Sequence, residues 1–499
     1  MALFPPDIPG AADKPEPVAV DPVPVSDPTP DIRPGFKLFP FQVEGAQWLD
    51  NMGSGILADE MGVGKTATAI EWAKTKRPCL VVCPASLVLN WADKELRTNW
   101  RRNDSVLVLE GDTPFPATLP DWTVCSFGQL PRFLSNIKRA GYQSLMVDEA
   151  HQIRNWSSDR AQNVLEIVSP RVPAPTDRRP SYRLAITGTP LVNNNLDGFP
   201  LLVLAGVRER SDWLGYRFTF RDPERSRDLN NILKPIMLLR MKAEVYPTLG
   251  PKTYTVLPVA LSNAAEYQQV QDAFLQWLKA SHPEAVQSAI NAEAIVRLNA
   301  LRNVCSAGKV APLSDWLRPC GDGGPKVIIF STFVKPLEEL QRRHPQALVY
   351  KGDLSKEDRQ AFVDRFQTDP GVCYFLGTYA TAGLGITLTA ADRVVLLDLP
   401  WVPADKQQAE DRAHRFGQKR NVEIINVVAK NTVDEHILTI LEQKEVLIGS
   451  AVEGAPLETA KRASIAGDVL RQIRASPVDA QAPHYISDDD LERPGRSVT

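Results

Sequence analysis

The sequence contains few cysteines and few histidines, six of each among its 499 residues. No two cysteines form a C-x-x-C pair, and no histidine stands at zinc-finger spacing from any of them, which argues against the common structural zinc sites. Four cysteines lie in or beside apolar runs, where cysteine acts as a small buried hydrophobic side chain. A disulfide-stabilised secreted domain is therefore excluded, and a reducing cytosol is the expected setting. The four are Cys79, Cys83, Cys125 and Cys373.

Long apolar runs and a strong net charge are also missing from the sequence. No stretch approaches the roughly 18–20 uninterrupted apolar residues that a membrane span requires, so we expect no membrane partner. Residues 1–30 lack the charged and then apolar pattern of a signal peptide, and export is not expected. The formal net charge is only −3, so any nucleic-acid contact must come from a local basic surface.

What is present predicts a multidomain α/β protein. At about 100–200 residues per domain, the length predicts two to four domains. Two series of apolar, strand-length runs alternate with helical patterns, which predicts two α/β lobes built on doubly wound parallel sheets. The expected strands are 54–58, 79–83, 105–109, 122–125, 144–148 and 183–187 in the first lobe and 326–331, 347–350, 372–376, 393–398 and 422–429 in the second.

Proline, arginine and helical patterns mark the expected boundaries. A segment with ten prolines among 35 residues cannot bury enough apolar area to offset the entropy of ordering, so a disordered tail is expected at the start. Six arginines between 207 and 227 are compatible with a phosphate-binding surface and equally with a solvated helical face. The expected domains are a Pro-rich tail (1–35), a first lobe (36–258) with an arginine-rich insert (196–250), a helical insertion or linker (259–311), a second lobe (312–450) and a C-terminal helix with a loose tail (451–499).

The strongest local signal is a glycine-containing loop between an apolar strand and a helix-forming run, the context that a phosphate loop requires. Gly62 and Gly64 let backbone N–H groups approach phosphate oxygens. Lys65 would reach the β- and γ-phosphates of ATP, and the Thr66 hydroxyl would ligate Mg²⁺. Asp59 stands where the strict pattern has its first glycine. The residues expected to bind the nucleotide here are Asp59, Met61, Gly62, Val63, Gly64, Lys65, Thr66 and Ala67.

A second apolar run, residues 144–148, ends in two adjacent carboxylates. Asp148 is placed to hold Mg²⁺, and Glu149 is placed to orient or deprotonate the attacking water. Acidic residues also end strands for purely structural reasons. Here, however, a Lys-Thr pair follows one strand and an Asp-Glu pair ends another strand of the same α/β series. This combination indicates ATP hydrolysis.

Further motifs follow in order over roughly residues 36–450. They are Leu38–Leu49 with Gln42, Val82–Trp91, Ala185–Asn194, Phe330–Phe333, Gly383–Asp392 with Gly385, and Gln408–Gln418. With the phosphate loop and Asp148-Glu149-Ala150-His151, these runs resemble the boxes of superfamily 2 helicase-like ATPases, and their Swi/Snf-type branch in particular. Leu38–Leu49 corresponds to the family's Q-motif, Val82–Trp91 to box Ia and Ala185–Asn194 to box III. Phe330–Phe333 corresponds to box IV, Gly383–Asp392 to box V and Gln408–Gln418 to box VI, which is the most specific of them.

The resemblance implies a fold, an activity and partners. It implies two RecA-like lobes and a DNA-dependent ATPase that uses ATP and Mg²⁺ and moves on double-stranded DNA without sequence specificity. It further implies that Gln42 reads adenine, that box Ia meets the DNA backbone, that box III couples hydrolysis to lobe movement and that Gly385 contacts the nucleotide. Thr387 departs from the asparagine common in box V, and Leu239 replaces the first arginine of the family's Leu-Arg-Arg-x-Lys segment.

Box VI has a spacing that supports a catalytic interpretation. Gln408, Arg412 and Arg415 fall at i, i+4 and i+7, which predicts one shared helical face. In a two-lobed ATPase a guanidinium can stabilise charge on the γ-phosphate in the transition state, so both arginines are expected to bind nucleotide and to act in catalysis. Two arginines at this spacing also occur on solvated helices. The spacing does not say which of the two would be the principal arginine finger, the residue that stabilises the γ-phosphate charge.

Two alternative functions remain open from the sequence. One is a true strand-separating DNA helicase, and the other is a non-catalytic scaffold that recruits partners through the Pro-rich tail. Intact Lys65, Asp148, Glu149 and Arg412 favour an enzyme over a scaffold. The compact build resembles bacterial, phage or annealing-helicase-like members, so the expected location is the cytoplasm of a bacterial or phage-infected cell, or the nucleus if the source is eukaryotic.

Overall fold

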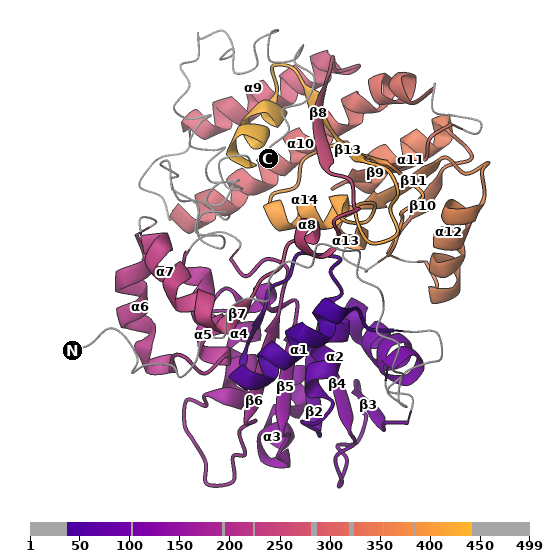
Figure 1. The fold of residues 1–499 in the computed structure, drawn as a ribbon. Helices are drawn as coiled ribbons and strands as arrows, with labels where there is room; N and C mark the ends of the chain where they lie inside the picture. The colour runs from indigo at the N-terminus through magenta and orange to yellow at the C-terminus, as the bar shows by residue number, and fades with distance from the viewer. Residues whose placement is uncertain are drawn as a thin grey trace. The chain divides into compact units, whose positions relative to one another are not determined.

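The computed structural model of the protein describes two compact units, which divide between Thr248 and Leu249 (Figure 1). Each unit is considered by itself. The described residues are 37–100, 103–191, 195–222, 225–280, 287–318, 324–352, 354–382 and 386–441. The expected tails, 1–35 and 451–499, lie outside these ranges, as do part of box III (192–194) and part of box V (383–385, with Gly385).

Unit 1 is built on a parallel sheet with strand order β3-β4-β2-β5-β6-β1-β7. Its strands are β1 (Gly55–Leu57), β2 (Cys79–Cys83), β3 (Val106–Leu109), β4 (Trp122–Ser126), β5 (Ser144–Asp148), β6 (Tyr182–Ile186) and β7 (Met237–Leu238). Its helices are α1 (Pro40–Met52), α2 (Lys65–Ala73), α3 (Leu130–Ala140), α4 (Asp159–Val168), α5 (Gly198–Leu204), α6 (Trp213–Phe220), α7 (Ser226–Leu233) and α8 (Lys242–Val245), with the 3₁₀ turn η1 (Ala85–Leu87) and the π-helix η2 (Asn90–Trp100).

The two faces of this sheet bury two separate cores. Alternate residues of β2 show this: Leu80 and Val82 pack into one core with α3, α4 and α5, while Cys79 and Val81 pack into the other with α1, α2 and η2. All residues of β2 are buried, which is why the strand is apolar at consecutive positions. The helices on both faces make this lobe a doubly wound α/β unit, as the strand series predicts.

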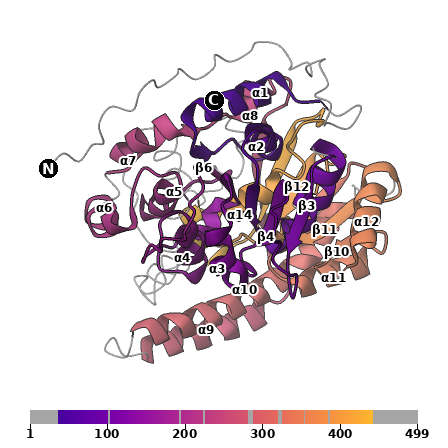
Figure 2. The same cartoon turned by 90° about the horizontal axis from the view of Figure 1, so that it is seen from below.

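Unit 2 contains a second parallel sheet, with strand order β10-β11-β9-β12-β13-β8. Its strands are β8 (Lys252–Val259), β9 (Val327–Ser331), β10 (Leu348–Tyr350), β11 (Tyr374–Thr378), β12 (Arg393–Leu396) and β13 (Val422–Ala429). Its helices are α9 (Ala264–Ala280), α10 (Gln287–Leu317), α11 (Val334–Arg343), α12 (Lys356–Thr368), α13 (Tyr379–Ala382) and α14 (Pro403–Glu410). Figure 2 shows α9 and α10 side by side.

The expected boundary of the first lobe at residue 258 is wrong. Strand β8 pairs in parallel with β13 along its whole length, from Lys252 opposite Val422 to Val259 opposite Ala429, and so belongs to the second sheet. It lies at the sheet edge with mostly exposed or half-buried side chains, and such a strand leaves no continuous apolar run in the sequence.

The helical segment expected as a separate insertion, residues 259–311, also belongs to unit 2. Helix α10 continues across the expected 311/312 boundary, and its Leu298, Leu301 and Leu313 are buried in the same core as β9 and β12. The helical pattern itself is as expected. Only the inference that it forms a domain of its own is corrected, because that depends on tertiary packing.

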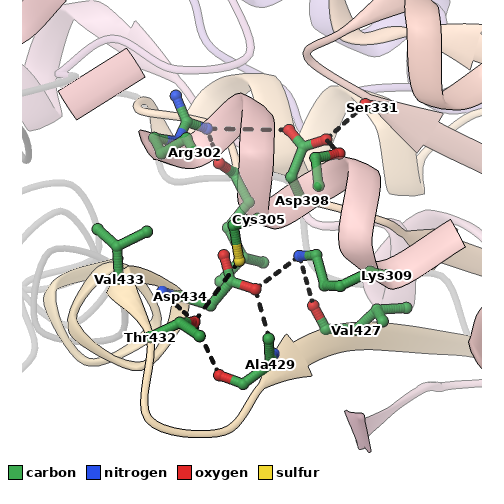
Figure 3. A network of polar contacts seen from close by, with 12 residues as sticks. Arg302, Cys305, Lys309, Ser331, Asp398, Val427, Ala429, Thr432, Val433 and Asp434 are labelled. Carbon is green, nitrogen blue, oxygen red and sulfur yellow. Dashed lines mark hydrogen bonds and ion pairs between the residues drawn. The ribbon is translucent and has the colours of Figure 1, made fainter. Parts of the chain in front are cut away.

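Polar residues of α10 bind it to strand β13 and to the segments that follow β12 and β13 (Figure 3). The Lys309 amine is fully buried and donates to Asp434 Oδ2 at 2.6 Å and to the Val427 carbonyl at 3.0 Å. The Arg302 guanidinium lies 3.8 Å from Asp398 Oδ1 and donates to the Leu399 carbonyl. Removing one partner of such a pair leaves an uncompensated buried charge, which typically costs about 3–5 kcal/mol. These pairs therefore hold α10 as an integral part of the unit.

No helix among the residues that the structure describes is both long enough and apolar enough to cross a membrane.

Candidate functional site

The glycine loop between β1 and α2 has the backbone shape that a phosphate loop needs. Gly62 and Gly64 have φ angles of +89° and +93°, in the left-handed region that glycine adopts without steric cost. Helix α2 begins at Lys65, immediately after Gly64, so the N-terminus of the helix faces the turn. Its unpaired N–H groups and dipole favour an anionic group at this position.

Lys65 lies inside this loop. Its amine donates hydrogen bonds to the carbonyl oxygens of Asp59 at 2.9 Å and of Glu60 at 3.4 Å. Box III approaches it closely, since a Cβ added to Gly188 would lie 3.2 Å from the Lys65 nitrogen and still closer to Met61. A side chain at residue 188 would therefore crowd the amine.

The Asp59 carboxylate has a different partner from the Asp59 carbonyl. The carboxylate is fully buried and accepts from Arg240 Nε at 3.0 Å, and Arg240 also donates to the Phe41 carbonyl. Asp59 therefore shapes the loop through its side chain and contacts Lys65 through its carbonyl. The sequence places Arg240 in a family-like segment but gives no sign of this partner, which lies 181 residues away.

Gln42 of the Q-motif is folded onto the same loop. Its side-chain amide nitrogen lies 3.4 Å from the carbonyl oxygens of both Val63 and Gly64, and its Oε1 accepts from the Phe39 N–H at 3.0 Å. The glutamine is therefore near the glycine turn, and in this structure its polar atoms are engaged with the backbone.

The paired carboxylates lie at the end of β5. Asp148 Oδ1 accepts from the Glu149 N–H at 2.9 Å, and Oδ2 accepts from Trp91 Nε1 at 2.7 Å. Glu149 has φ +49°, an unfavourable conformation for a residue with a side chain, and such strain is concentrated at functional sites. Glu149 Oε2 lies 3.2 Å from His151 Nδ1.

The acidic pair carries negative charge that the protein compensates only in part. Burial and the neighbouring Glu149 charge together raise the pKa of Asp148 to about 6, against the opposing effects of the Trp91 hydrogen bond and the Lys65 charge. A carboxyl group with a raised pKa gains from a nearby cation. The Asp148 carboxylate and the Thr66 hydroxyl at the start of α2 thus offer the hard oxygen ligands that suit Mg²⁺.

These groups converge because their strands are neighbours. Strands β5, β6 and β1 are adjacent in the sheet, and they lead at their carboxyl ends to Asp148, Gly188 and the glycine loop. Ligands of open parallel α/β sheets bind at this edge. The fold thus brings the sequence-predicted residues Lys65, Asp148 and Glu149 into one region of unit 1.

The expected helical face in box VI is wrong. Helix α14 ends at Glu410, so Arg412 and Arg415 lie in the turn that follows it. The two guanidiniums nevertheless converge, because each donates to the Ile386 carbonyl, at 3.3 Å from Arg412 and 3.2 Å from Arg415. Arg415 also donates to the Thr387 hydroxyl at 3.0 Å, so the residue that departs from the usual asparagine has a partner in box VI.

The sequence gives no indication of the residue that anchors box VI. The Lys252 amine of β8 lies 3.0 Å from Glu410 and 2.8 Å from Asp411. These two carboxylates raise the pKa of Lys252 against the opposing effect of its burial. Box VI is therefore attached to the edge strand by an ion-pair cluster.

The arginine-rich segment 207–227 divides into two kinds of residue. Arg210 is structural, since it donates to the Gln162 carbonyl at 2.9 Å and lies 3.4 Å from Glu166. Arg217, Arg221 and Arg227 are exposed. The structure is compatible with both interpretations of this surface.

Comparison with known proteins identifies the chain. The family model described as "SNF2-related domain" matches residues 41–309, more than half of the chain, and the "Helicase conserved C-terminal domain" matches residues 308–417. The chain belongs to the SNF2-related family. The resemblance seen in the sequence boxes is thereby confirmed.

Several curated proteins are similar to this SNF2-related chain. The "ISWI chromatin-remodeling complex ATPase ISW1" of Saccharomyces cerevisiae is 30% identical over 82% of this chain and 40% of its own length. The "Uncharacterized ATP-dependent helicase MG018" of Mycoplasma genitalium is 28% identical over 82% of this chain and 41% of its own length. The match spans less than half the length of these curated relatives.

Among solved structures, the "Sulfolobus solfataricus SWI2/SNF2 ATPase core in complex with dsDNA" is 25% identical, with a TM-score of 0.41. That match covers 85% of this SNF2-related chain and 94% of the solved chain.

Proposed function

We propose that this SNF2-related chain hydrolyses ATP and uses the energy to move along double-stranded DNA. The observation that carries the proposal is the convergence of Lys65, the Asp148–Glu149 pair and Gly188 at the carboxyl ends of adjacent strands. The names of the relatives, which describe ATPases and an ATP-dependent helicase, support it.

The residues of unit 1 suggest how the phosphates are handled. Lys65 would exchange its loop carbonyl partners for the β- and γ-phosphates, and the N–H groups of the glycine turn would bind phosphate oxygens. Thr66 and Asp148 would hold Mg²⁺, which neutralises phosphate charge when bound. Glu149, held beside Asp148 in a strained conformation, would orient the attacking water and accept its proton.

Other predicted residues complete the proposal. Gln42 would read the adenine while remaining close to the glycine turn, and Gly385 would contact the nucleotide from box V. Arg412 and Arg415 would stabilise charge on the γ-phosphate, so that hydrolysis would depend on residues of both units. That dependence is how we propose that hydrolysis drives movement on DNA.

Double-stranded DNA is the proposed partner. The exposed residues Ala85 and Ser86 of box Ia and the exposed arginines of segment 207–227 would contact phosphates without reading sequence. A DNA substrate places the protein where DNA is, in the cytoplasm of a bacterial or phage-infected cell or in a eukaryotic nucleus.

The test is ATP turnover with and without duplex DNA. We expect duplex to stimulate the wild-type chain. Lys65→Ala should lower kcat at least about 100-fold because a charge-assisted contact to the transferring phosphate is lost. Glu149→Gln should lower kcat about 10²–10⁴-fold while ATP still binds. Glu110→Gln, which changes an exposed residue of the same unit, should keep wild-type turnover.

The same preparation separates the alternatives. Displacement of a triplex strand without unwinding of a duplex supports translocation, whereas unwinding of a forked duplex supports a strand-separating helicase. Absence of turnover with and without DNA would support a scaffold and contradict the proposed function.

A further inference from the structure

Trp91 makes a contact that none of the proposed roles uses. It is the last residue of box Ia and the second residue of η2, its side chain is 1% exposed, and its indole N–H donates to Asp148 Oδ2 at 2.7 Å. The other carboxylate oxygen, Oδ1, accepts from the Glu149 N–H. Asp148 is thus held by donors from two separate segments of the chain.

This contact restricts the orientation of the carboxylate. An indole N–H is only a donor, and a hydrogen bond to an ionised oxygen is short and roughly twice as strong as a neutral one. The ring itself is fixed, because Trp91 is packed in the core formed with α2 and η2. The lone pairs of Asp148 that remain free therefore point in a direction that Trp91 determines.

The same residue is close to the surface where box Ia is exposed. Ala85 and Ser86 in η1 are exposed, Val88 is buried, and η2 begins at Asn90. Only a few residues separate the proposed DNA contact from the indole. A displacement of η1 and η2 would move Trp91 and, with it, the Asp148 oxygen that it holds.

We propose that Trp91 is a positioning residue that orients Asp148 toward the Mg²⁺-bound nucleotide and links that site to DNA bound at box Ia. The inference rests on the proposed function and extends it, because it names a physical connection between the two ligands. Trp91 itself touches neither the nucleotide nor DNA in this account.

The chain contains a matched control for the experiment. Trp122 in β4 is fully buried, packs in the same core, and donates to a carboxylate oxygen, Asp104 Oδ2, at the same 2.7 Å. It stands at the start of its strand rather than at the carboxyl edge. Trp91→Phe and Trp122→Phe therefore remove equivalent indole–carboxylate bonds at different places.

The test measures binding of AMP-PNP, a non-hydrolysable ATP analogue, to the full chain while Mg²⁺ is titrated. Trp91→Phe should raise the Mg²⁺ concentration for half-maximal enhancement of binding about 10–100-fold, the usual cost of losing a residue that orients a metal ligand. Trp122→Phe should match the wild type. Mg²⁺-free AMP-PNP affinity should be equal in all three proteins, which shows that the glycine loop remains folded.

A second arm adds duplex DNA and measures the change in Mg²⁺–AMP-PNP affinity. Trp91→Phe should reduce the effect of DNA by roughly 2- to 30-fold relative to Trp122→Phe. A Trp91→Phe protein with the Mg²⁺ response of the wild type overturns the inference, and so does one in which the DNA effect is unchanged. If the wild-type protein binds no AMP-PNP, the proposed function itself is contradicted. That outcome is distinct from a failure of the inference about Trp91, in which the wild type binds AMP-PNP and Trp91→Phe behaves like it.

Discussion

Asp148 shows how burial changes the chemistry of one residue. The carboxyl group is buried at the end of β5 beside Glu149, and its pKa rises from 3.8 to about 6. Between these values the folded chain binds more protons than the unfolded chain, so the contribution of this group to stability falls as the pH rises through that window. Above pH 6 the ligand-free protein bears the whole cost of the ionised carboxylate.

Replacing this carboxylate should therefore stabilise the ligand-free protein. At pH 7, Asp148→Asn should raise the free energy of unfolding by roughly 2–3 kcal/mol, because each pKa unit corresponds to about 1.36 kcal/mol. The gain should shrink as the pH is lowered from 7 to 5. Thermal unfolding across this pH range measures it, with Asp112→Asn, an exposed aspartate, as the control. A lower Tm at pH 7 would contradict this description of the site.

At the scale of elements, the turn after α14 is organised by contacts rather than by helical periodicity. Lys252 holds Glu410 and Asp411 from β8, and Ile386 accepts hydrogen bonds from both box VI arginines. The guanidiniums are therefore presented from an irregular segment fixed at both ends. Preorganisation of this kind is what a group that stabilises transition-state charge requires.

The box VI arginines should affect turnover more than binding. Arg412→Ala and Arg415→Ala should each lower kcat, by up to about 10³–10⁵-fold for the principal finger, while ATP affinity changes much less. Arg420→Ala, which removes a half-exposed arginine of the same turn paired with Asp392, is the control. Steady-state turnover and equilibrium ATP binding are the measurements, and unchanged turnover in both variants would assign box VI to a purely structural role.

At the scale of the whole molecule, the net charge of −3 leaves no general attraction for DNA. Affinity for phosphates must then be concentrated in local basic surface. Segment 207–227 offers exposed arginines, although Arg210 is used within the fold. The DNA contact of this surface remains a prediction.

Reversing the charge of this segment tests it. Arg221, Arg225 and Arg227 changed together to Glu should weaken DNA binding on any sequence alike. The change should also flatten the plot of log affinity against log salt by about 0.9 for each lost duplex-phosphate contact. ATP turnover without DNA should survive. The control reverses Arg318, Arg342 and Arg343, three exposed arginines of unit 2, and alters net charge equally. Equal effects in both triple variants would mean that the segment is ordinary surface.

Local patterns in the sequence were sufficient to predict the two α/β lobes and the glycine turn between β1 and α2. Doubly buried strands such as Cys79–Cys83 are apolar at consecutive positions, and a glycine turn between a strand and a helix is visible without knowledge of the fold. The edge strand Lys252–Val259 was missed because its side chains are largely exposed. The helical face expected for Arg412 was wrong because spacing does not reveal where a helix ends.

The sequence by itself determined the doubly buried strands and the glycine turn between a strand and a helix, because those signals lie in neighbouring residues. Only the tertiary structure decided which residues support the motifs. Asp59 meets Arg240 across 181 residues, and Glu410 meets Lys252 across 158. These partners depend on the order of strands in each sheet, and that order is decided by packing of the whole unit rather than by any local pattern.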